Sequence, residues 1–426
     1  MTPRSAGESE GRLRLPQGLP FAERAVLPNG LRIITERLEH VGSVSLGLWL
    51  DVGLRDESPG CEGINHFLEH MVFKGTRSRS ALQIAEAADS IGGQVNGYTD
   101  HEVMYLYART VAEQVEAALD LLFDLLLNPA CAADDIAREK EVVLQEIRHV
   151  EDAPEDWVHD LLLATAWPDH PLGRSVMGSR EGVMALDRGH LLDHLAAVQS
   201  PGRIVVTAAG RLDHARIVDV VASLAGPLPP GRPPRPDVAP VLHAGSVRVR
   251  RSTGQVHFCL GTAGCGHRAP EQYVFAVLDL ILGGGASSRL FQEIRENRGL
   301  AYHIGSYLQS FRSAGLFAVD AGAAPEEFDL VVDLIGREVA RLRAEGPSPQ
   351  ELERARVQLQ VALSLAAESS SFRMQHLALC ELHWGRVLPF DEIIAGINAV
   401  SAEDVFGLAG RVFAPDGQAL VAIGPF

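Results

Sequence analysis

The chain reads Gly42-Ser-Val-Ser-Leu-Gly-Leu-Trp-Leu-Asp-Val-Gly53 near its start and Gly254-Gln-Val-His-Phe-Cys-Leu-Gly-Thr-Ala-Gly264 at an offset of 212 residues. In both segments a strand-like alternation ends in a glycine-containing turn, and a helical pattern follows. Similarity that recurs at half the chain length indicates an internal duplication. Because 426 residues also exceed what one hydrophobic core usually serves, we expect two related domains.

A proline-rich run separates the two halves. Residues 227–240 read PLPPGRPPRPDVAP, and half of them are proline. Proline cannot continue a helix or a central strand, so this run favours an extended, semi-rigid connector. We therefore predict an N-terminal domain at residues 1–226 with a flexible tail at 1–20, a linker at 227–240, and a C-terminal domain at 241–426.

Strand and helix patterns mix in each half without regular βαβ alternation. Strands are expected at residues 32–36, 43–52, 94–99, 103–108, 203–208, 246–260, 301–307 and 315–321. Helices are expected at residues 65–73, 81–91, 112–127, 133–150, 157–166, 188–198, 271–282, 326–344, 349–368 and 372–384. This mixture predicts an α+β fold with two similar domains, each a mainly antiparallel sheet with helices packed on it.

Composition excludes several classes of function. A net charge of −17 offers no basic surplus for phosphates, so we expect no nucleic-acid partner. No apolar run reaches the 18 residues of a membrane span, so no membrane is expected either. The polar N-terminus lacks the features of a signal or transit peptide, which favours a soluble, cytoplasmic protein. Five scattered cysteines favour reduced, mostly buried thiols: Cys61, Cys131, Cys259, Cys265 and Cys380.

The segment Ile64–Phe73, INHFLEHMVF, carries the pattern HxxEH, the inverted form of the HExxH zinc motif. At roughly 100° per helical residue, His66 and His70 project about 40° apart and can bind one ion. Zinc accepts neutral imidazole nitrogen and keeps one position open for water in catalytic sites. Glu69 would lie beside that water, where a carboxylate can act as a general base. The pattern therefore predicts two zinc ligands and a catalytic base.

A catalytic zinc needs a third protein ligand, and one helical segment offers two candidates. Glu139 and Glu146 are seven residues apart, so they share a helical face two turns apart. We predict Glu146 as the third ligand of a single zinc ion per chain. Glu139 is predicted as its neighbour, a group that orients an imidazole or polarises the site.

Three other patterns are set aside. His190-Leu-Leu-Asp-His194 is also a helical histidine pair, but its acid is the shorter aspartate and no paired glutamates follow, so we interpret it as structural. Gly7-Glu-Ser-Glu-Gly11 fits GxSxG but lies in the polar tail, which argues against a serine hydrolase. The run from Gly283 to Arg289 is neither GxGxxG nor a P-loop, so nucleotide binding is rejected.

HxxEH followed by a glutamate 76 positions beyond the second histidine resembles the insulinase/pitrilysin family of zinc peptidases. The flanking sequences are similar to the β subunit of mitochondrial processing peptidase and its bacterial single-chain homologues: PNGLRI at residues 28–33, GINHFLEHMVFKGT at 63–76 and EDAPED at 151–156. The resemblance implies two similar domains, of which only the first carries zinc, and a homodimer or a heterodimer with a related subunit. It also implies that a peptide substrate binds as an extended strand.

Several residues match functional positions of that family. Asn96 and Gly97 lie in a segment similar to the one along which the peptide is bound. Arg295 and Tyr302 match an Arg–Tyr pair that reaches substrate near the zinc, where Tyr302 would donate to the oxyanion and Arg295 would hold a peptide carbonyl. A glycine-rich loop is similar to one used in substrate handling, namely Gly283, Gly284 and Gly285.

These features predict a zinc-dependent endopeptidase acting on peptides or presequence-like segments. The alternative within the family is a partner-dependent or non-catalytic subunit of a processing-peptidase-like heterodimer. An alternative of another class is a peptide-capturing chaperone. The retained HxxEH favours the enzyme, while Leu54, between Gly53 and Arg55, departs from the small polar residue more usual there.

Overall fold

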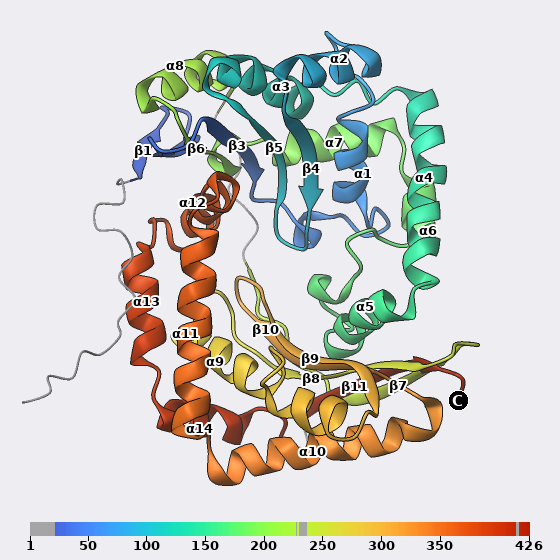
Figure 1. Ribbon diagram of the computed structural model, residues 1–426. Coiled ribbons are helices and arrows are strands. Elements are labelled where there is room, and N and C mark those ends of the chain that lie inside the picture. The colour runs from blue at the N-terminus through green and yellow to red at the C-terminus, as the bar shows by residue number, and fades with distance from the viewer. Residues whose placement is uncertain (1–21, 227, 230–236, 415–416) are drawn as a thin grey trace, which may run out of the picture.

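The computed structural model describes residues 22–226, 228–229, 237–414 and 417–426, and they form two sheets with helices around them (Figure 1). The first sheet has the order β1-β2-β6-β3-β5-β4 and the second the order β7-β11-β8-β10-β9. The first sheet comprises β1 (Glu23–Val26), β2 (Arg32–Arg37), β3 (Ser43–Leu50), β4 (Gln94–Thr99), β5 (Met104–Val111) and β6 (Ile204–Gly210). The second comprises β7 (Gly245–Arg250), β8 (Val256–Ala263), β9 (Ala301–Ser310), β10 (Gly315–Ala323) and β11 (Gln418–Gly424).

The two sheets share one topology. In the first, β2 and β6 are parallel and the pairs β6–β3, β3–β5 and β5–β4 are antiparallel. The second repeats this with β7 and β11 parallel, followed by antiparallel β11–β8, β8–β10 and β10–β9. β3 and β8 hold the same central place, as the repeated segments predicted. The α+β fold with mainly antiparallel sheets is thereby confirmed.

Fourteen α-helices are present in the described part of the chain, eight before residue 227 and six after it. The first eight are α1 (Ile64–Met71), α2 (Ala81–Ile91), α3 (Val115–Leu127), α4 (Ala133–Glu151), α5 (Pro154–Ala166), α6 (Arg180–Ala185), α7 (Arg188–Val198) and α8 (His214–Ala225). The others are α9 (Gln272–Leu282), α10 (Phe328–Glu345), α11 (Pro349–Ala366), α12 (Ser370–Trp384), α13 (Phe390–Ala399) and α14 (Ala402–Arg411). Sequence patterns missed β1, α6, α8, α13, α14 and β11, most of which are short.

Each half sends one helix onto the sheet of the other half. α5 packs on β8 and β11, and α12 packs on β3 and β6. Glycines admit both helices, because a Cβ on Gly261 would meet a Leu162 methyl at 2.8 Å and one on Gly47 would meet the Met374 sulfur at 2.5 Å. The interlocked packing therefore holds the two sheets in a defined relation.

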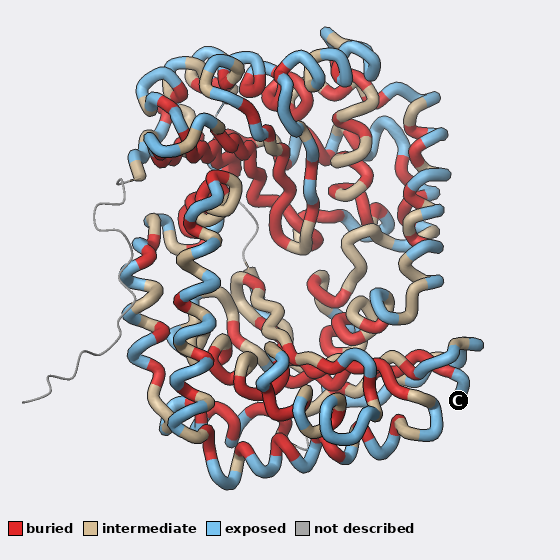
Figure 2. Tube along the Cα trace, viewed as in Figure 1, coloured by how far each residue is buried: buried red, intermediate tan, exposed pale blue. Residues whose placement is uncertain are grey.

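Burial follows the same plan. Figure 2 shows the strands of both sheets largely buried and the outer helices exposed on one side. All five cysteines are buried and unpaired, as expected for reduced thiols. The predicted tail and most of the predicted linker lie outside the described residues, so the domain boundaries stay a prediction. Within the described chain, no helix by itself has the length and apolar content of a membrane span, and the bent pair α13–α14 meets that test only jointly.

Candidate metal centre

The start of α1 is held by buried polar contacts. Gly63 begins the helix at φ 91°, a conformation that favours glycine. The Glu57 carboxylate accepts hydrogen bonds from the backbone N–H groups of Gly63 at 3.0 Å and Asn65 at 3.2 Å. The Asn65 side chain donates to the Gly53 carbonyl, and its oxygen lies 2.7 Å from His194 Nε2. The second histidine pair thus supports α1 through His194, a structural role.

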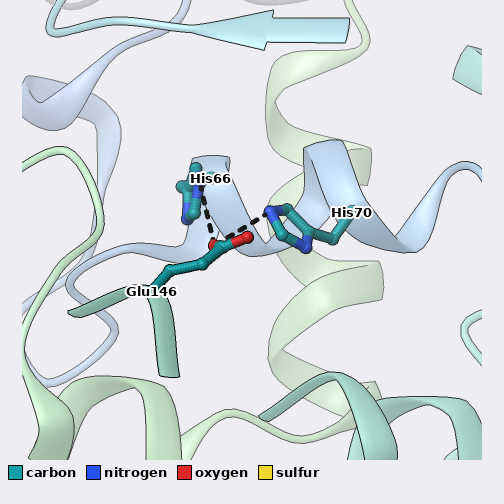
Figure 3. A group of neighbouring side chains, drawn as sticks. All are labelled: His66, His70 and Glu146. Carbon is teal, nitrogen blue, oxygen red and sulfur yellow. Dashed lines mark ion pairs between the residues drawn. The ribbon is translucent and has the colours of Figure 1, made fainter. Parts of the chain in front are cut away.

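His66 and His70 face Glu146 of α4 across the contact between the two helices (Figure 3). The Glu146 carboxylate lies 3.8 Å from His66 Nε2 and 3.4 Å from His70 Nε2. One ligand atom from each residue fits within 4.8 Å of the others. Val143 and Ile147 are buried in a cluster with apolar residues of α1, which sets the spacing between α1 and α4. The sequence-predicted ligand set therefore meets in space.

The chemistry of these three side chains fits a zinc ion. Burial, and then the charge of His70, lowers the pKa of His66 to about 4, so this imidazole is neutral at neutral pH. His66 Nδ1 and Glu146 Oε2 are buried and have no hydrogen-bond partner among the described residues. Two imidazoles and one carboxylate form a ligand set found in catalytic zinc sites.

Glu139 lies behind His70 rather than in the ligand cluster. Its carboxylate is 2.9 Å from His70 Nδ1 and 2.8 Å from the Lys74 ammonium. Burial opposes ionisation of Glu139, but the hydrogen bonds from Lys74 and His70 outweigh it and lower the pKa of Glu139. Such a carboxylate fixes the tautomer and orientation of an imidazole ligand. Lys74 was not predicted; it lies four residues after His70, beyond the end of α1 at Met71.

The Glu69 side chain projects from α1 toward the edge strand β4. A Cβ on Gly97 would meet Glu69 Cγ at 2.8 Å, so the glycine makes room for this side chain. Burial raises the pKa of Glu69, while the nearby Thr99 hydroxyl and His70 lower it. Sequence reasoning assigned Gly97 to substrate alone and missed Thr99, although both alternate onto one face of β4.

The predicted substrate residues of the second half lie apart from this cluster. The Arg295 guanidinium stacks on the Tyr302 ring at 5.0 Å, and Tyr302 is 79% exposed. Tyr302 is on β9 in the lower sheet of Figure 1, whereas α1 and α4 are in the upper half. No contact between this Arg–Tyr pair and the three predicted ligands occurs within the residues described.

The three glycines of the predicted loop differ from one another. A Cβ on Gly283 would meet the Ser306 backbone nitrogen at 2.4 Å, and one on Gly284 would meet Leu280 Cα at 3.0 Å. A Cβ on Gly285 would meet nothing within 4 Å. Gly283 and Gly284 therefore leave no free room for a side chain, whereas Gly285 does.

Two family models match most of the chain. The model described as Insulinase (Peptidase family M16) covers residues 32–180, and the model described as Peptidase M16 inactive domain covers residues 185–359. The first match contains the histidine pair, Glu69, Glu139 and Glu146. The second contains Arg295, Tyr302 and the glycine-rich loop.

Bacterial proteins resemble the chain over nearly its whole length. An uncharacterised zinc protease of Streptomyces coelicolor is 36% identical, covering 99% of this chain and 94% of the relative. One from Bacillus subtilis is also 36% identical, covering 95% and 98%. Among solved structures, a peptidase M16 inactive domain from Pseudomonas fluorescens has a TM-score of 0.89 at 19% identity, covering 95% of this chain and 98% of that one. A protease from Helicobacter pylori has a TM-score of 0.88 at 20% identity, covering 96% and 100%.

Proposed function

The chain belongs to the insulinase family of zinc peptidases (peptidase family M16), and on that premise we propose that it is a zinc-dependent endopeptidase. It would bind one zinc ion per chain through His66, His70 and Glu146. The observation that carries the proposal is the meeting of these three ligand atoms within 4.8 Å, beside a carboxylate seated against β4.

A zinc ion bound here would lower the pKa of its water and polarise the peptide carbonyl. Glu69 takes the proton from the attacking water and later delivers it to the leaving amine, as a general base and then a general acid. The burial of Glu69 suits this role, because it raises the pKa of the carboxyl toward neutral pH, where general acid–base catalysis is most efficient. Glu139 holds His70 in the orientation that presents Nε2 to the metal.

We further propose that the peptide binds as an added strand on β4. β4 is at the edge of its sheet and, among the described strands, pairs with β5 alone. Its outer edge can therefore supply main-chain hydrogen bonds to an extended peptide. Asn96 and Gly97 lie on this strand next to Glu69. Arg295 and Tyr302 would contact the peptide from the second half of the chain, as would the loop of Gly283, Gly284 and Gly285.

The assembly is proposed as a dimer, with a second copy of this chain or with a related subunit. A partner-dependent or non-catalytic role is not favoured by any specific feature of the site, because all predicted catalytic groups are retained. The mass of the purified protein in solution, alone and with zinc, separates monomer from homodimer. Activity of a homogeneous preparation separates the homodimer from a subunit that needs a different partner.

The substitution Glu69→Gln tests the proposed function. It keeps the size of the side chain and removes the base, so peptide hydrolysis should fall by about 10²- to 10⁴-fold. Zinc content and affinity for an unstructured peptide should stay at the wild-type level. Glu86→Gln, at an exposed position of α2, is the matched control and should leave hydrolysis unchanged. Equal turnover in Glu69→Gln and the wild type would contradict the assignment.

A further inference from the structure

A cavity of about 340 Å³ is lined by residues of both halves of the chain. The β4–β5 and β9–β10 hairpins, which contribute to its walls, point toward each other (Figure 1). Tyr98 and His101 of the first hairpin line one wall, and Phe311 of the second lines another. His383 from α12 and His267 complete it. The site thus takes residues from both duplicated units and from the helix that crosses between them.

The walls of this cavity are fixed by bonds between the halves. The Arg312 backbone N–H donates to the Glu102 carboxylate at 2.8 Å, and the Arg312 guanidinium pairs with Asp51 at 2.8 Å. The rings of His101 and Phe311 meet edge to face at 5.2 Å. Glu102 and Asp51 are therefore engaged with Arg312, while Asp100, the other carboxylate that lines the cavity, accepts hydrogen bonds from the backbone N–H groups of Glu102 and Val103.

Two of these imidazoles have buried nitrogen atoms without partners in the described structure. They are His101 Nε2 and His383 Nδ1. His383 is only 3% exposed, and its ring lies 4.0 Å from that of His267. Buried polar atoms are nearly always hydrogen-bonded in folded proteins, so these two nitrogens favour an occupant that carries a hydrogen-bonding group.

The electrostatic environment disfavours a cation in this cavity. Burial, followed by the charge of Arg312, lowers the pKa of His267 to about 4. Burial lowers the pKa of His101 to about 4, and burial with neighbouring His267 and arginines lowers that of His383 to about 2. Two carboxylates line the cavity as well, and burial raises the pKa of Asp100 and raises that of Glu102 to about 7. The cavity therefore disfavours charge of either sign, which opposes a lysine or arginine side chain as well as an imidazolium. The fitting occupant is uncharged and has a ring that can stack on aromatic walls.

The cavity connects to the candidate reaction centre through β4. Thr99 lines the cavity, and Gly97, two residues earlier on β4, lies directly against the Glu69 side chain, since a Cβ there would meet Glu69 Cγ at 2.8 Å. Tyr98, the neighbouring residue on β4, is half exposed. A peptide strand paired with β4 would therefore pass the mouth of the cavity within a few residues of the bond next to Glu69.

We propose that this cavity is a specificity pocket that takes an uncharged aromatic side chain with a hydrogen-bonding group, tyrosine above all, from the peptide bound along β4. The inference rests on the proposed function, since it assumes a peptide on that strand. The tyrosine hydroxyl would bond to the unpartnered nitrogens of His101 and His383. Lysine and arginine would be rejected at the same peptide position.

Cleavage of a peptide library by the zinc-loaded enzyme tests this pocket. The wild type should prefer tyrosine over arginine at one peptide position by at least about 10-fold. Leu379→Trp fills the cavity from a position that is 39% exposed on α12, and it should abolish that preference while other positions keep theirs. Leu365→Trp, on the exposed face of α11, is the matched control and should change nothing. An unchanged profile in Leu379→Trp would overturn the proposal.

His101→Phe gives a second, independent readout. It keeps the ring and removes the nitrogen, so the preference for tyrosine over phenylalanine should fall by roughly 10-fold, because the hydroxyl loses a partner. Binding of tyrosine- and arginine-containing peptides to Glu69→Gln separates this inference from the proposed function. If the wild type cleaves no peptide but Glu69→Gln still binds the tyrosine peptide more tightly, the endopeptidase fails and the pocket stands. Cleavage without any aromatic preference would contradict the specificity pocket and leave the endopeptidase proposal intact.

Discussion

The helices α1 and α9 each follow the central strand of a duplicated unit, yet they differ in the polarity of their side chains. α1 places Ile64, Phe67, Leu68 and Met71 in the core and turns His66, Glu69 and His70 toward α4 and β4. α9 reads QYVFAVLDLIL and has one charged residue, Asp279. Five of its apolar side chains are buried in the core of the second half. One topology thus supports a polar centre in one unit and a continuous apolar core in the other.

The difference shows what a polar centre requires of its surroundings. Glu57 and Asn65 hold the start of α1, and Glu139 contacts His70 on the same helix. These contacts are needed because buried polar groups must be hydrogen-bonded. The strand beside it carries Gly97, which leaves space for Glu69. In the second unit the corresponding edge strand β9 carries one glycine, Gly305, and a Cβ there would make ordinary contact with Asp320 at 3.4 Å. Functional asymmetry therefore resides in supporting residues as well as ligands.

Removing the third ligand should have the largest effect on the polar centre of the first unit. Glu146→Ala leaves two imidazoles for the metal, so zinc affinity should fall by more than the roughly 100-fold that loss of an outer partner costs. Hydrolysis should fall to the level of the chelator-treated wild type. Glu353→Ala on the exposed face of α11 is the control in the second unit and should retain both. Metal content by mass spectrometry and peptide turnover measure the two effects. Full zinc occupancy in Glu146→Ala would remove this residue from the ligand set.

Substituting one glycine in each unit tests whether the edge strand β4 differs from β9 in making room for a catalytic side chain. In Gly97→Ala the new methyl displaces Glu69, and a shift of about 1 Å at a catalytic group can cost about 100-fold in rate. Zinc content should stay unchanged, because His66 and His70 face α4. Gly305→Ala should alter hydrolysis less than twofold, since its methyl meets no close contact. Single-turnover rates with equal zinc loading distinguish the two variants. Equal rates would mean that Gly97 does not position Glu69.

Much of this asymmetry could be predicted from the sequence because it rests on local spacing. HxxEH defines a helical face by itself, and the seven-residue separation of Glu139 and Glu146 defines another. Strand alternation in two similar segments indicated the duplication, and the shared strand order agrees with it. These signals depend on side-chain periodicity within one element, which a single sequence contains.

Contacts between distant elements could not be predicted in the same way. Gly97 reads as a strand glycine, and only the approach of α1 to β4 explains its absent side chain. His194 lies 129 positions from Asn65, and no spacing rule connects them. The exchange of α5 and α12 between the sheets depends on glycine notches at Gly261 and Gly47. Such features follow from tertiary packing, which overrides local pattern.

Weakening the support of His70 should have an intermediate effect. Glu139→Gln keeps a hydrogen-bond acceptor but loses the charge that Lys74 and His70 share. Zinc affinity should fall by about 10-fold, at the lower end of the range for loss of such a carboxylate. Turnover at saturating zinc should change less than affinity. Competition with a chelator gives the affinity, and an unaltered value would show that Glu139 does not orient the ligand.

The smallest effect on hydrolysis is expected at Asp279, the one charge on α9. Burial raises the pKa of this carboxyl to about 6, against the lowering effect of the hydrogen bond from Ser306. Because the folded pKa lies above the ordinary value of about 3.9, the group favours folding below about pH 4 and loses that contribution as pH rises through 6. Asp279→Asn keeps an acceptor for Ser306 and cannot ionise.

The stability of Asp279→Asn relative to the wild type should therefore grow between pH 4 and pH 7, by at most about 3 kcal/mol, while zinc content and turnover remain unchanged. Denaturant unfolding at the two pH values measures it. A constant difference across this range would mean that the carboxyl titrates alike in the folded and unfolded chains. A growing difference means that the ionised Asp279 carboxylate on α9 lowers the free energy of unfolding, because the hydrogen bond from Ser306 does not offset its burial. The polar residues of α1, in contrast, serve as the proposed metal ligands and base.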